Sequence, residues 1–154
     1  MRKIEYKGIT LYVTEDGRVF GPTQKERKIQ TNPKRQNRKE VNTSKGKLYV
    51  HILVAKGFPE ICGEWFDGCE VHHKDGDVTN NNAANLQIVS KKQHWLLHKG
   101  ILVQEDKDGN IVGEYISSLE AEKETGISGA AIRECLRGRS QTSGGYIWYR
   151  KKAS

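Results

Sequence analysis

The stretch EVHHKDGDVTNNNAANLQIVSKKQHWLLH, residues 70–98, decides the fold of this chain. The short apolar runs at residues 69–71 and 86–89 predict two strands, because turn-forming residues border each of them. Between them, residues 74–84 are rich in Asp and Asn and predict a long polar loop. A serine after the second strand can cap a helix that completes the stretch. The predicted order is therefore strand, long loop, strand, helix.

Histidines are concentrated in the same stretch. Four of the five fall within 27 positions, namely His72, His73, His94 and His98. His94 and His98 are four residues apart, so a helix presents them on one face. His72 and His73 are neighbours on an extended strand, so their rings point to opposite sides. Imidazoles bind divalent metal ions well. We therefore expect one ring of the adjacent pair to bind a metal and the other to act on a water molecule beside it.

This division of roles suits the hydrolysis of a phosphodiester bond. A hairpin packed on the helix can bring His72 and His94 to one cation, which would stabilise the charge on a scissile phosphate. A neutral imidazole has a pKa near working pH and can take a proton from the attacking water. The amide of Asn85 both donates and accepts, so it can tie the long loop together and hold the base histidine from behind.

Positive charge is concentrated in the first third of the chain. The 154 residues carry a net charge of +7, and residues 1–50 hold 13 Lys and Arg against 5 Asp and Glu. The other two thirds are close to neutral. Such an excess favours a polyanion as partner, because neutralised phosphates release counterions. We predict that these residues contact DNA: Lys25, Arg27, Lys28, Lys34, Arg35, Arg38, Lys39, Lys74, Lys91, Lys92, Arg133, Arg137 and Arg139.

The N-terminal flank predicts a small β module and a helix. Alternating apolar residues around Asp16-Gly17 predict a hairpin over residues 4–20. Residues 21–47 are too polar to bury a face, so they form either a flexible arm or a β-ribbon that meets phosphate. Residues 48–58 then predict a strand followed by a short core helix.

The C-terminal flank predicts a second hairpin, over residues 101–116, followed by a helix-turn-helix. Ser117 and Glu120 form a capping box at the start of the first helix. Residues 128–136 predict a second helix, with a serine cap, after a turn that contains glycine. Two short helices joined in this way are typical of a helix-turn-helix. Residues 145–150 predict a last strand that pairs with the hairpin.

Composition argues against several other classes of protein. The apolar fraction of 35% predicts small cores, and we expect an extended, modular protein. The apolar runs are too short to span a bilayer, and no apolar segment follows the N-terminus as in a secretory signal. Three cysteines without a C-x-x-C pair argue against a disulfide framework or a cysteine-based zinc site. We predict a cytoplasmic protein, in the host cell if it is phage-encoded.

The histidine-rich stretch resembles the HNH endonucleases, which have a ββα-metal fold. The resemblance rests on residues 70–76, the asparagines at 80–82, Asn85 with Leu86, and His94. The Asn-rich loop is especially similar to that of the HNH homing endonucleases of phages and group I introns.

The resemblance implies a role for each residue of the motif. His72 and His94 would bind the metal, His73 would be the general base and Asn85 would order the loop. Some members of the family carry a further histidine, matching His98, near the metal or the phosphate, so we count His98 among the catalytic residues. Phage intron members often have Asp and Asn where this chain has His72 and His94. One divalent ion is implied, Mg²⁺ or Mn²⁺ first, with Zn²⁺ or Ni²⁺ as alternatives.

The resemblance extends to both flanks and sets the predicted architecture. Residues 11–20 resemble the NUMOD4-like module that precedes HNH domains, and residues 117–146 resemble the helix-turn-helix module that follows them. Residues 50–58 resemble the helix leading into the motif, which makes His51 structural. We therefore predict an α+β protein with a ββα-metal core and two DNA-binding flanks. The predicted domains are a basic antiparallel β module (1–50), the HNH catalytic domain (51–100) and a helix-turn-helix module (101–154).

The predicted function is site-specific, metal-dependent cleavage of double-stranded DNA by a monomer. Hydrolysis would leave 3′-hydroxyl and 5′-phosphate ends, and a single catalytic centre would cut one strand per binding event. An alternative is a DNA-binding regulator that uses the helix-turn-helix and retains the HNH part as a relic. A third possibility is an RNA-binding or RNA-cutting factor, but no aromatic stacking platform is evident.

Overall fold

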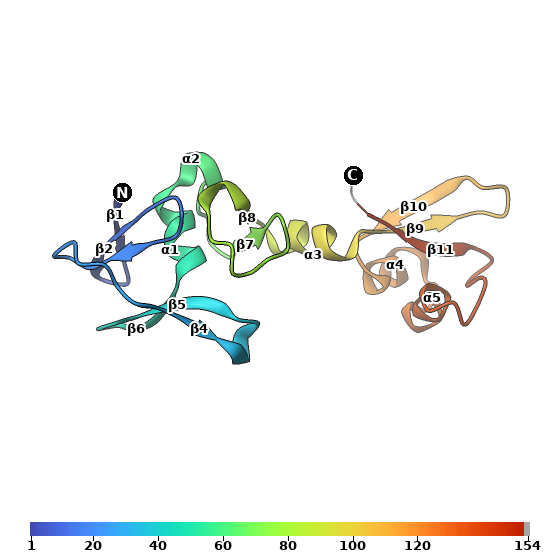
Figure 1. The fold of residues 1–154 in the computed structure, drawn as a ribbon. Helices are drawn as coiled ribbons and strands as arrows, with labels where there is room; N and C mark the ends of the chain where they lie inside the picture. The colour runs from blue at the N-terminus through green and yellow to red at the C-terminus, as the bar shows by residue number, and fades with distance from the viewer. Residues whose placement is uncertain (153–154) are drawn as a thin grey trace. The chain divides into compact units, whose positions relative to one another are not determined.

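A computed structural model describes residues 1–152, and the chain forms two compact units, Met1–Ser90 and Lys91–Ser154 (Figure 1). Both units mix small antiparallel sheets with short helices. The three cysteines are free thiols. Among the described residues, no helix combines the length and the apolar character needed to cross a membrane.

The N-terminal unit holds three sheets, ordered β1-β2-β3, β4-β5-β6 and β7-β8. Its strands are β1 (Arg2–Tyr6), β2 (Ile9–Val13), β3 (Val19–Phe20), β4 (Ile29–Asn32), β5 (Arg38–Thr43), β6 (Gly46–Tyr49), β7 (Glu70–His73) and β8 (Leu86–Val89). Its helices are α1 (Val50–Gly57) and α2 (Pro59–Cys62), with single 3-10 turns η1 (Pro33–Arg35) and η2 (Ala83–Asn85).

Two of the turns in this unit differ in how well the sequence predicted them. The predicted Asp16-Gly17 turn connects β2 to β3, but the longer hairpin, β1-β2, turns at Lys7-Gly8. Both residues of that turn have positive φ, 51° and 72°, as the tight turns favoured in hairpins require. Lysine rarely adopts this conformation, so the residue types at this turn do not predict it. Of the two predictions for residues 21–47, the β-ribbon is the one observed, as β4, β5 and the first half of β6.

One hydrophobic core runs through the whole N-terminal unit. It extends from Ile4 in β1 to Ile88 in β8, and Leu53 and Val54 of α1 are fully buried within it. Helix α1 packs against strands from all three sheets. Residues 1–50 and 51–90 therefore share one core, because neither part has enough apolar surface to build a core alone. The boundary between compact units follows residue 90, whereas we predicted boundaries after residues 50 and 100.

The second unit builds a smaller core of its own. Strands β9 (Ile101–Glu105), β10 (Ile111–Tyr115) and β11 (Ile147–Lys151) form a sheet in the order β10-β9-β11, which confirms that the last strand pairs with the hairpin. Helices α4 (Ser118–Thr125) and α5 (Gly129–Leu136) pack against this sheet. Helix α3 (Lys91–Lys99) precedes the sheet in the chain. The core consists of Leu102, Tyr115, Ala121, Ile132, Cys135 and Trp148.

The two helix caps predicted in this unit had different outcomes. Ser117 Oγ accepts a hydrogen bond from the Glu120 amide at 3.1 Å, which confirms the serine cap. The Glu120 carboxylate accepts from the Ile116 amide instead of the Ser117 amide, so the reciprocal bond of a capping box is not the one observed. Ser128 stands at the N-cap of α5, which confirms where the helix begins, but its side chain makes no capping bond, so the predicted bond was wrong. The first residue of α5 is Gly129, which approaches the Ser118 backbone closely. The start of α5 is therefore fixed by tertiary packing more than by a local cap.

Candidate active site

The two adjacent histidines lie on opposite faces of β7. Burial alternates along the strand, so that His72 is half-buried whereas Val71 and His73 face the core. This confirms that the two rings point apart. His73, however, is only 4% exposed, although we expected it to face a water molecule. The reason is the strand's alternation, which places His73 on the same face as Val71.

His73 is held by two neighbours within the unit. Its Nε2 lies 3.1 Å from Asn81 Oδ1, and its ring lies edge-on to that of His51 with 5.4 Å between centroids. Because an amide oxygen can only accept, Nε2 donates this bond and Nδ1 is left as the basic nitrogen. Burial lowers the pKa of His73, against the opposing effect of the Asn81 bond. The ring is therefore a neutral base at neutral pH.

Asn85 organises the long loop but does not hold His73. Its Nδ2 donates to Asp75 Oδ1 and to the Asn80 carbonyl, both at 2.9 Å, and its Oδ1 accepts from the Asp75 amide at 3.1 Å. The predicted tie across the loop is thus present. The prediction that Asn85 fixes the base histidine was wrong, because Asn81 makes that bond. The only sequence signal for Asn81 was its place in an Asn-rich run, which does not distinguish it from its neighbours.

The loop also holds an ionised carboxylate close to this network. Hydrogen bonds from the side chains of Asn80 and Asn85 lower the pKa of Asp75, with a smaller effect from the Asp77 backbone. Lys74 is tied down as well, because its Nζ donates to the Ala84 carbonyl at 2.8 Å. Of the predicted DNA contacts, Lys74 is therefore part of the loop's internal bonding.

His94 and His98 form a close pair on α3. Their Nε2 atoms are 3.0 Å apart and their rings meet edge-on, with centroids 4.6 Å apart. Metal–nitrogen bonds of about 2.0–2.1 Å, at angles of about 90–110°, place two ligand nitrogens about 2.9–3.4 Å apart. The observed separation fits two ligands of one cation, and it equally fits a hydrogen bond when one ring is protonated at Nε2. The donor set is thus suited to a divalent metal ion.

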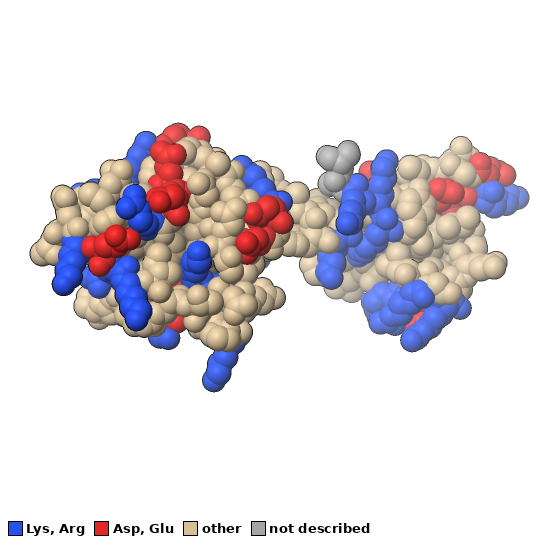
Figure 2. All heavy atoms as spheres, viewed as in Figure 1, with Lys and Arg blue, Asp and Glu red and all other residues tan. Residues whose placement is uncertain are grey.

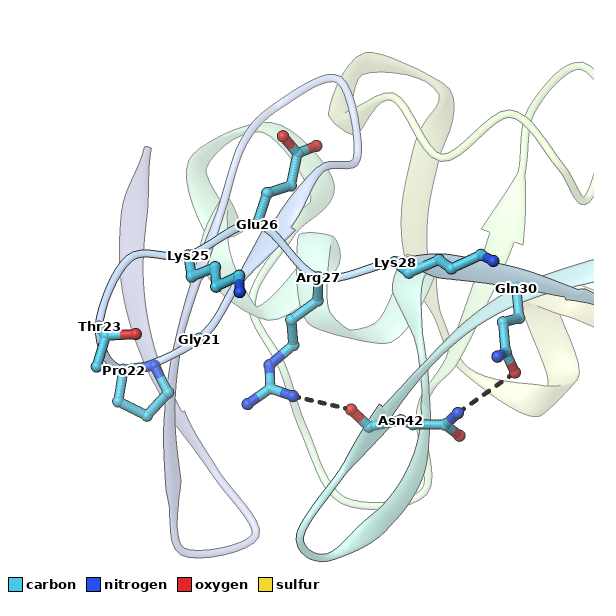
Figure 3. A pocket seen from close by; sticks show the side chains of 9 residues that line it. All are labelled: Gly21, Pro22, Thr23, Lys25, Glu26, Arg27, Lys28, Gln30 and Asn42. Carbon is cyan, nitrogen blue, oxygen red and sulfur yellow. Dashed lines mark hydrogen bonds between the residues drawn. The ribbon is translucent and has the colours of Figure 1, made fainter.

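Apart from Lys74, the basic residues predicted to contact DNA in the first unit lie on and around the β-ribbon. Arg27 lines a hollow of about 350 Å³ together with Lys25 and Lys28, and Figure 3 shows its guanidinium directed at the backbone of Asn42. Arg27 Nη1 donates to the Asn42 carbonyl at 3.0 Å. Glu26 lines the same hollow, so the hollow carries charges of both signs. Lys34 and Arg35 are on η1, whereas Arg38 and Lys39 begin β5.

Most of the predicted DNA contacts in the second unit have intramolecular partners. Arg137 and Arg139 both pair with Glu134, at 2.6 and 3.3 Å, and Arg133 donates to Ser118 Oγ at 3.0 Å. Figure 2 shows Lys and Arg gathered where Figure 1 labels α5. Two further residues of the prediction, Lys91 and Lys92, are exposed in the first turn of α3.

Comparison with known families bears directly on the segment that contains β7, β8 and most of α3. Residues 48–96 match the family model described as HNH endonuclease. This HNH segment includes His72, His73, Asn85 and His94, so four of the five residues predicted to form the active site fall inside it. His98 lies two residues beyond its end.

Two relatives are uncharacterized HNH endonucleases of Acanthamoeba polyphaga mimivirus. The first is 29% identical over 147 residues, which covers 88% of this chain and 44% of the relative. The second is 30% identical over 95 residues, covering 54% of this chain and 24% of the relative. The chain thus spans less than half the length of either relative. A solved structure described as DNA binding and cleavage by the HNH homing endonuclease I-HmuI aligns over 100% of both chains, with 24% identity and a TM-score of 0.49.

Proposed function

We propose that this chain is a metal-dependent DNA endonuclease of the HNH type. The observation that carries the proposal is the imidazole pair of α3, with Nε2 atoms 3.0 Å apart, in and beside a segment that matches HNH endonucleases. Two imidazoles at this separation suit a cation, and a cation suits the hydrolysis of phosphodiesters. We further propose that His72 completes the metal site.

The chain connection between β8 and α3 supports the addition of His72 to the pair. In the β7-β8 register His72 lies opposite Gln87, and β8 leads into α3 with only Ser90 between them. The short connection therefore allows the first turns of α3 to reach His72. Three imidazoles suit Zn²⁺ or Ni²⁺ by donor type, whereas the family resemblance favours Mg²⁺ or Mn²⁺.

The other residues of the motif have distinct roles in this proposal. When bound, a divalent ion would act as a Lewis acid on the scissile phosphate and the leaving oxygen. His73 would accept the proton of the attacking water at Nδ1, since its Nε2 is committed to Asn81. Asn85 would keep the loop in shape around it. Because His73 is buried, its water must approach along the edge of the ring.

The proposed substrate is double-stranded DNA, bound by a monomer through basic residues of both units. Hydrolysis would leave 3′-hydroxyl and 5′-phosphate ends. With one catalytic centre in the chain, each binding event would nick one strand. Site specificity would come from the β-ribbon and from the α4-α5 helix pair, which we interpret as a helix-turn-helix.

The experiment that tests this proposal is the conversion of supercoiled plasmid to nicked circles, with Mg²⁺, Mn²⁺, Zn²⁺ or Ni²⁺ added separately. The wild type should nick in at least one metal, and His73→Ala should lose about two to four orders of magnitude in rate, as expected for removal of a general base. Lys107→Ala, in the exposed β9-β10 turn, is the control and should cut normally.

Metal binding is measured separately, by calorimetry on the intact chain without DNA. His94→Ala and His72→Ala should each weaken binding of the active metal at least tenfold, whereas His73→Ala should leave it nearly unchanged. If His73→Ala cuts as fast as the wild type, His73 is not the base. If no metal supports cutting, the endonuclease proposal is wrong.

A second candidate function is DNA binding without cleavage, and the burial of His73 favours it. A general base must meet its water molecule, and a ring that is 4% exposed meets solvent poorly. The plasmid assay separates the two functions. A protein that binds duplex DNA tightly and nicks it no faster than His73→Ala does would be a regulator.

A further inference from the structure

An open, basic groove of about 500 Å³ lies beside His73 in the N-terminal unit, and the nuclease motif does not include it. Lys34 and Arg35 of η1, Arg38 of β5, Tyr49 of β6 and His51 of α1 contribute to its lining. Among the described residues, no carboxylate lines the groove. The groove therefore combines three cations without a compensating anion on its walls.

Arg38 is held in this groove by an uncharged partner. Its Nη1 lies 3.3 Å from His51 Nε2. A guanidinium can only donate, so His51 accepts with a neutral ring. Burial and the nearby Arg38 lower the pKa of His51 to about 3, which keeps the ring neutral. Arg38 is thus oriented without losing its positive charge, unlike an arginine that pairs with a carboxylate.

The carboxylate nearest along the strand is already engaged. Glu40 lies two residues after Arg38 on β5 and is buried. It accepts from Lys47 Nζ at 2.7 Å and from Asn32 Nδ2 at 3.1 Å. These bonds, that of Lys47 first, lower the pKa of Glu40 and keep it ionised beside its own cation. Glu40 is therefore not the partner of Arg38.

The groove leads to the proposed base through stacked rings. His51 stacks on Tyr49 with centroids 5.5 Å apart and meets His73 edge-on at 5.4 Å. His51 Nδ1 is buried and has no hydrogen-bond partner among the described residues. A buried donor without a partner lowers stability, so packing alone does not account for this ring.

We propose that this groove binds a phosphate of the DNA strand, next to the scissile phosphate at which His73 acts as the general base. Arg38 makes the contact, and Lys34 and Arg35 extend it along the backbone. His51 is a positioning residue, because it orients the guanidinium without neutralising it. This proposal rests on the proposed function, which gives duplex DNA as the substrate. It adds a second contact to the DNA, outside the metal site.

The test measures affinity for a random-sequence duplex at several KCl concentrations, on the full chain with metal removed so that no cutting occurs. Each phosphate contact contributes about 0.9 to the slope of log affinity against log salt. Arg38→Gln should therefore lower the slope by about 0.9, whereas Lys107→Gln, with the same charge change, should leave it unchanged. A folding defect alone lowers the active fraction but not the slope.

Two further variants test the role of His51. His51→Glu places a carboxylate against the guanidinium and should reproduce the slope of Arg38→Gln. His51→Gln keeps an acceptor for Arg38 and should retain the wild-type slope. If His51→Glu retains the wild-type slope, His51 does not control Arg38 and the positioning role is wrong.

Inorganic phosphate, compared with KCl at equal ionic strength, distinguishes a strand phosphate from a free anion. Phosphate should displace the duplex no better than chloride does. Specific displacement by phosphate that disappears in Arg38→Gln would show a free-anion site instead and overturn the assignment to DNA.

The two proposals fail in different ways. If the wild type nicks plasmid and Arg38→Gln has an unchanged salt slope, only the groove proposal is wrong. If Arg38→Gln lowers the slope while the wild type fails to nick in every metal, the phosphate contact stands and the endonuclease proposal is wrong.

Discussion

His51 is a titratable side chain that the fold keeps neutral at the expense of acid stability. Its pKa is about 3 in the folded chain, against about 6.5 in an unfolded chain. Below pH 6.5 the unfolded state binds a proton that the folded state does not bind. The free energy of unfolding must then decrease as the pH falls, by about 1.4 kcal/mol per pH unit from this group, until the pH nears the folded pKa.

We predict that His51→Gln weakens this pH dependence. Between pH 6 and pH 4, the free energy of unfolding of the variant should decline less steeply than that of the wild type, by about 1 kcal/mol per pH unit. Urea unfolding at several pH values measures both slopes. The comparison uses slopes because the substitution also changes stability at every pH. Parallel slopes would mean that His51 titrates normally in the folded chain.

Asn85 is the residue on which the shape of the long loop depends. Its side chain makes three hydrogen bonds, to Asp75 and Asn80. Asn85→Ala should lower the free energy of unfolding by about 2 kcal/mol, at about 0.5–1.5 kcal/mol per hydrogen bond with some loss offset by water. Asn82→Ala is the matched control and should have a smaller effect, because that side chain accepts one bond, from the Ala84 amide.

Asn85→Asp gives a stricter test of the same network. The substitution keeps the acceptor for the Asp75 amide but places a carboxylate against the Asp75 carboxylate. It should therefore be more destabilising than Asn85→Ala at pH 7 and recover at low pH, as one of the two groups becomes protonated. Equal stability of the two variants at pH 7 would show that the amide donates no important bond to Asp75.

At the scale of elements, the packing of α4 on α5 depends on a glycine where the two helices meet. A Cβ atom at Gly129 would lie 2.9 Å from the Ser118 carbonyl oxygen, which is backbone and cannot simply turn away. Gly129→Ala should destabilise the unit by about 1–3 kcal/mol through overpacking, which outweighs the roughly 1 kcal/mol that alanine contributes to a helix.

Thermal unfolding followed by Trp148 fluorescence can measure this effect, since Trp148 is buried in the same unit. Ala130→Gly, at an exposed position one residue later, is the control for helix propensity and should cost about 1 kcal/mol. An increase in stability for Gly129→Ala would mean that α4 and α5 have room to separate.

Elements whose order was predicted correctly still differed in their details. The strand, loop, strand and helix of residues 70–99 could be predicted because their apolar residues lie in short runs between strong turn formers. The Lys7-Gly8 turn could not, because a lysine gives no signal for positive φ. The short helix α2 was also missed, since four residues that begin with proline have no periodicity to detect.

At the scale of the whole molecule, two separate cores imply two units that lose structure separately. Ile132 is fully buried in the core of the second unit, and Leu53 is fully buried in that of the first. Ile132→Ala should destabilise its unit by about 3 kcal/mol and should speed hydrogen exchange in β9 and β11 but not in α1 or β2. Leu53→Ala should speed hydrogen exchange in α1 and β2 but not in β9 or β11. Faster exchange in both units from either substitution would contradict independent cores.

The sequence by itself determined the chemistry: which residue types are present, their spacing, and the alternation that turns His72 and His73 to opposite faces. These follow from the covalent chain and from local periodicity, which operate over a few residues. The tertiary structure alone decided that the His73 face is the buried one, that Asn81 and not Asn85 bonds it, and that His51 holds Arg38 uncharged. Each of these depends on contacts between residues 8 to 22 positions apart. Only the packing of α1 against β5 and β7, and of the loop against β7, brings these residues together.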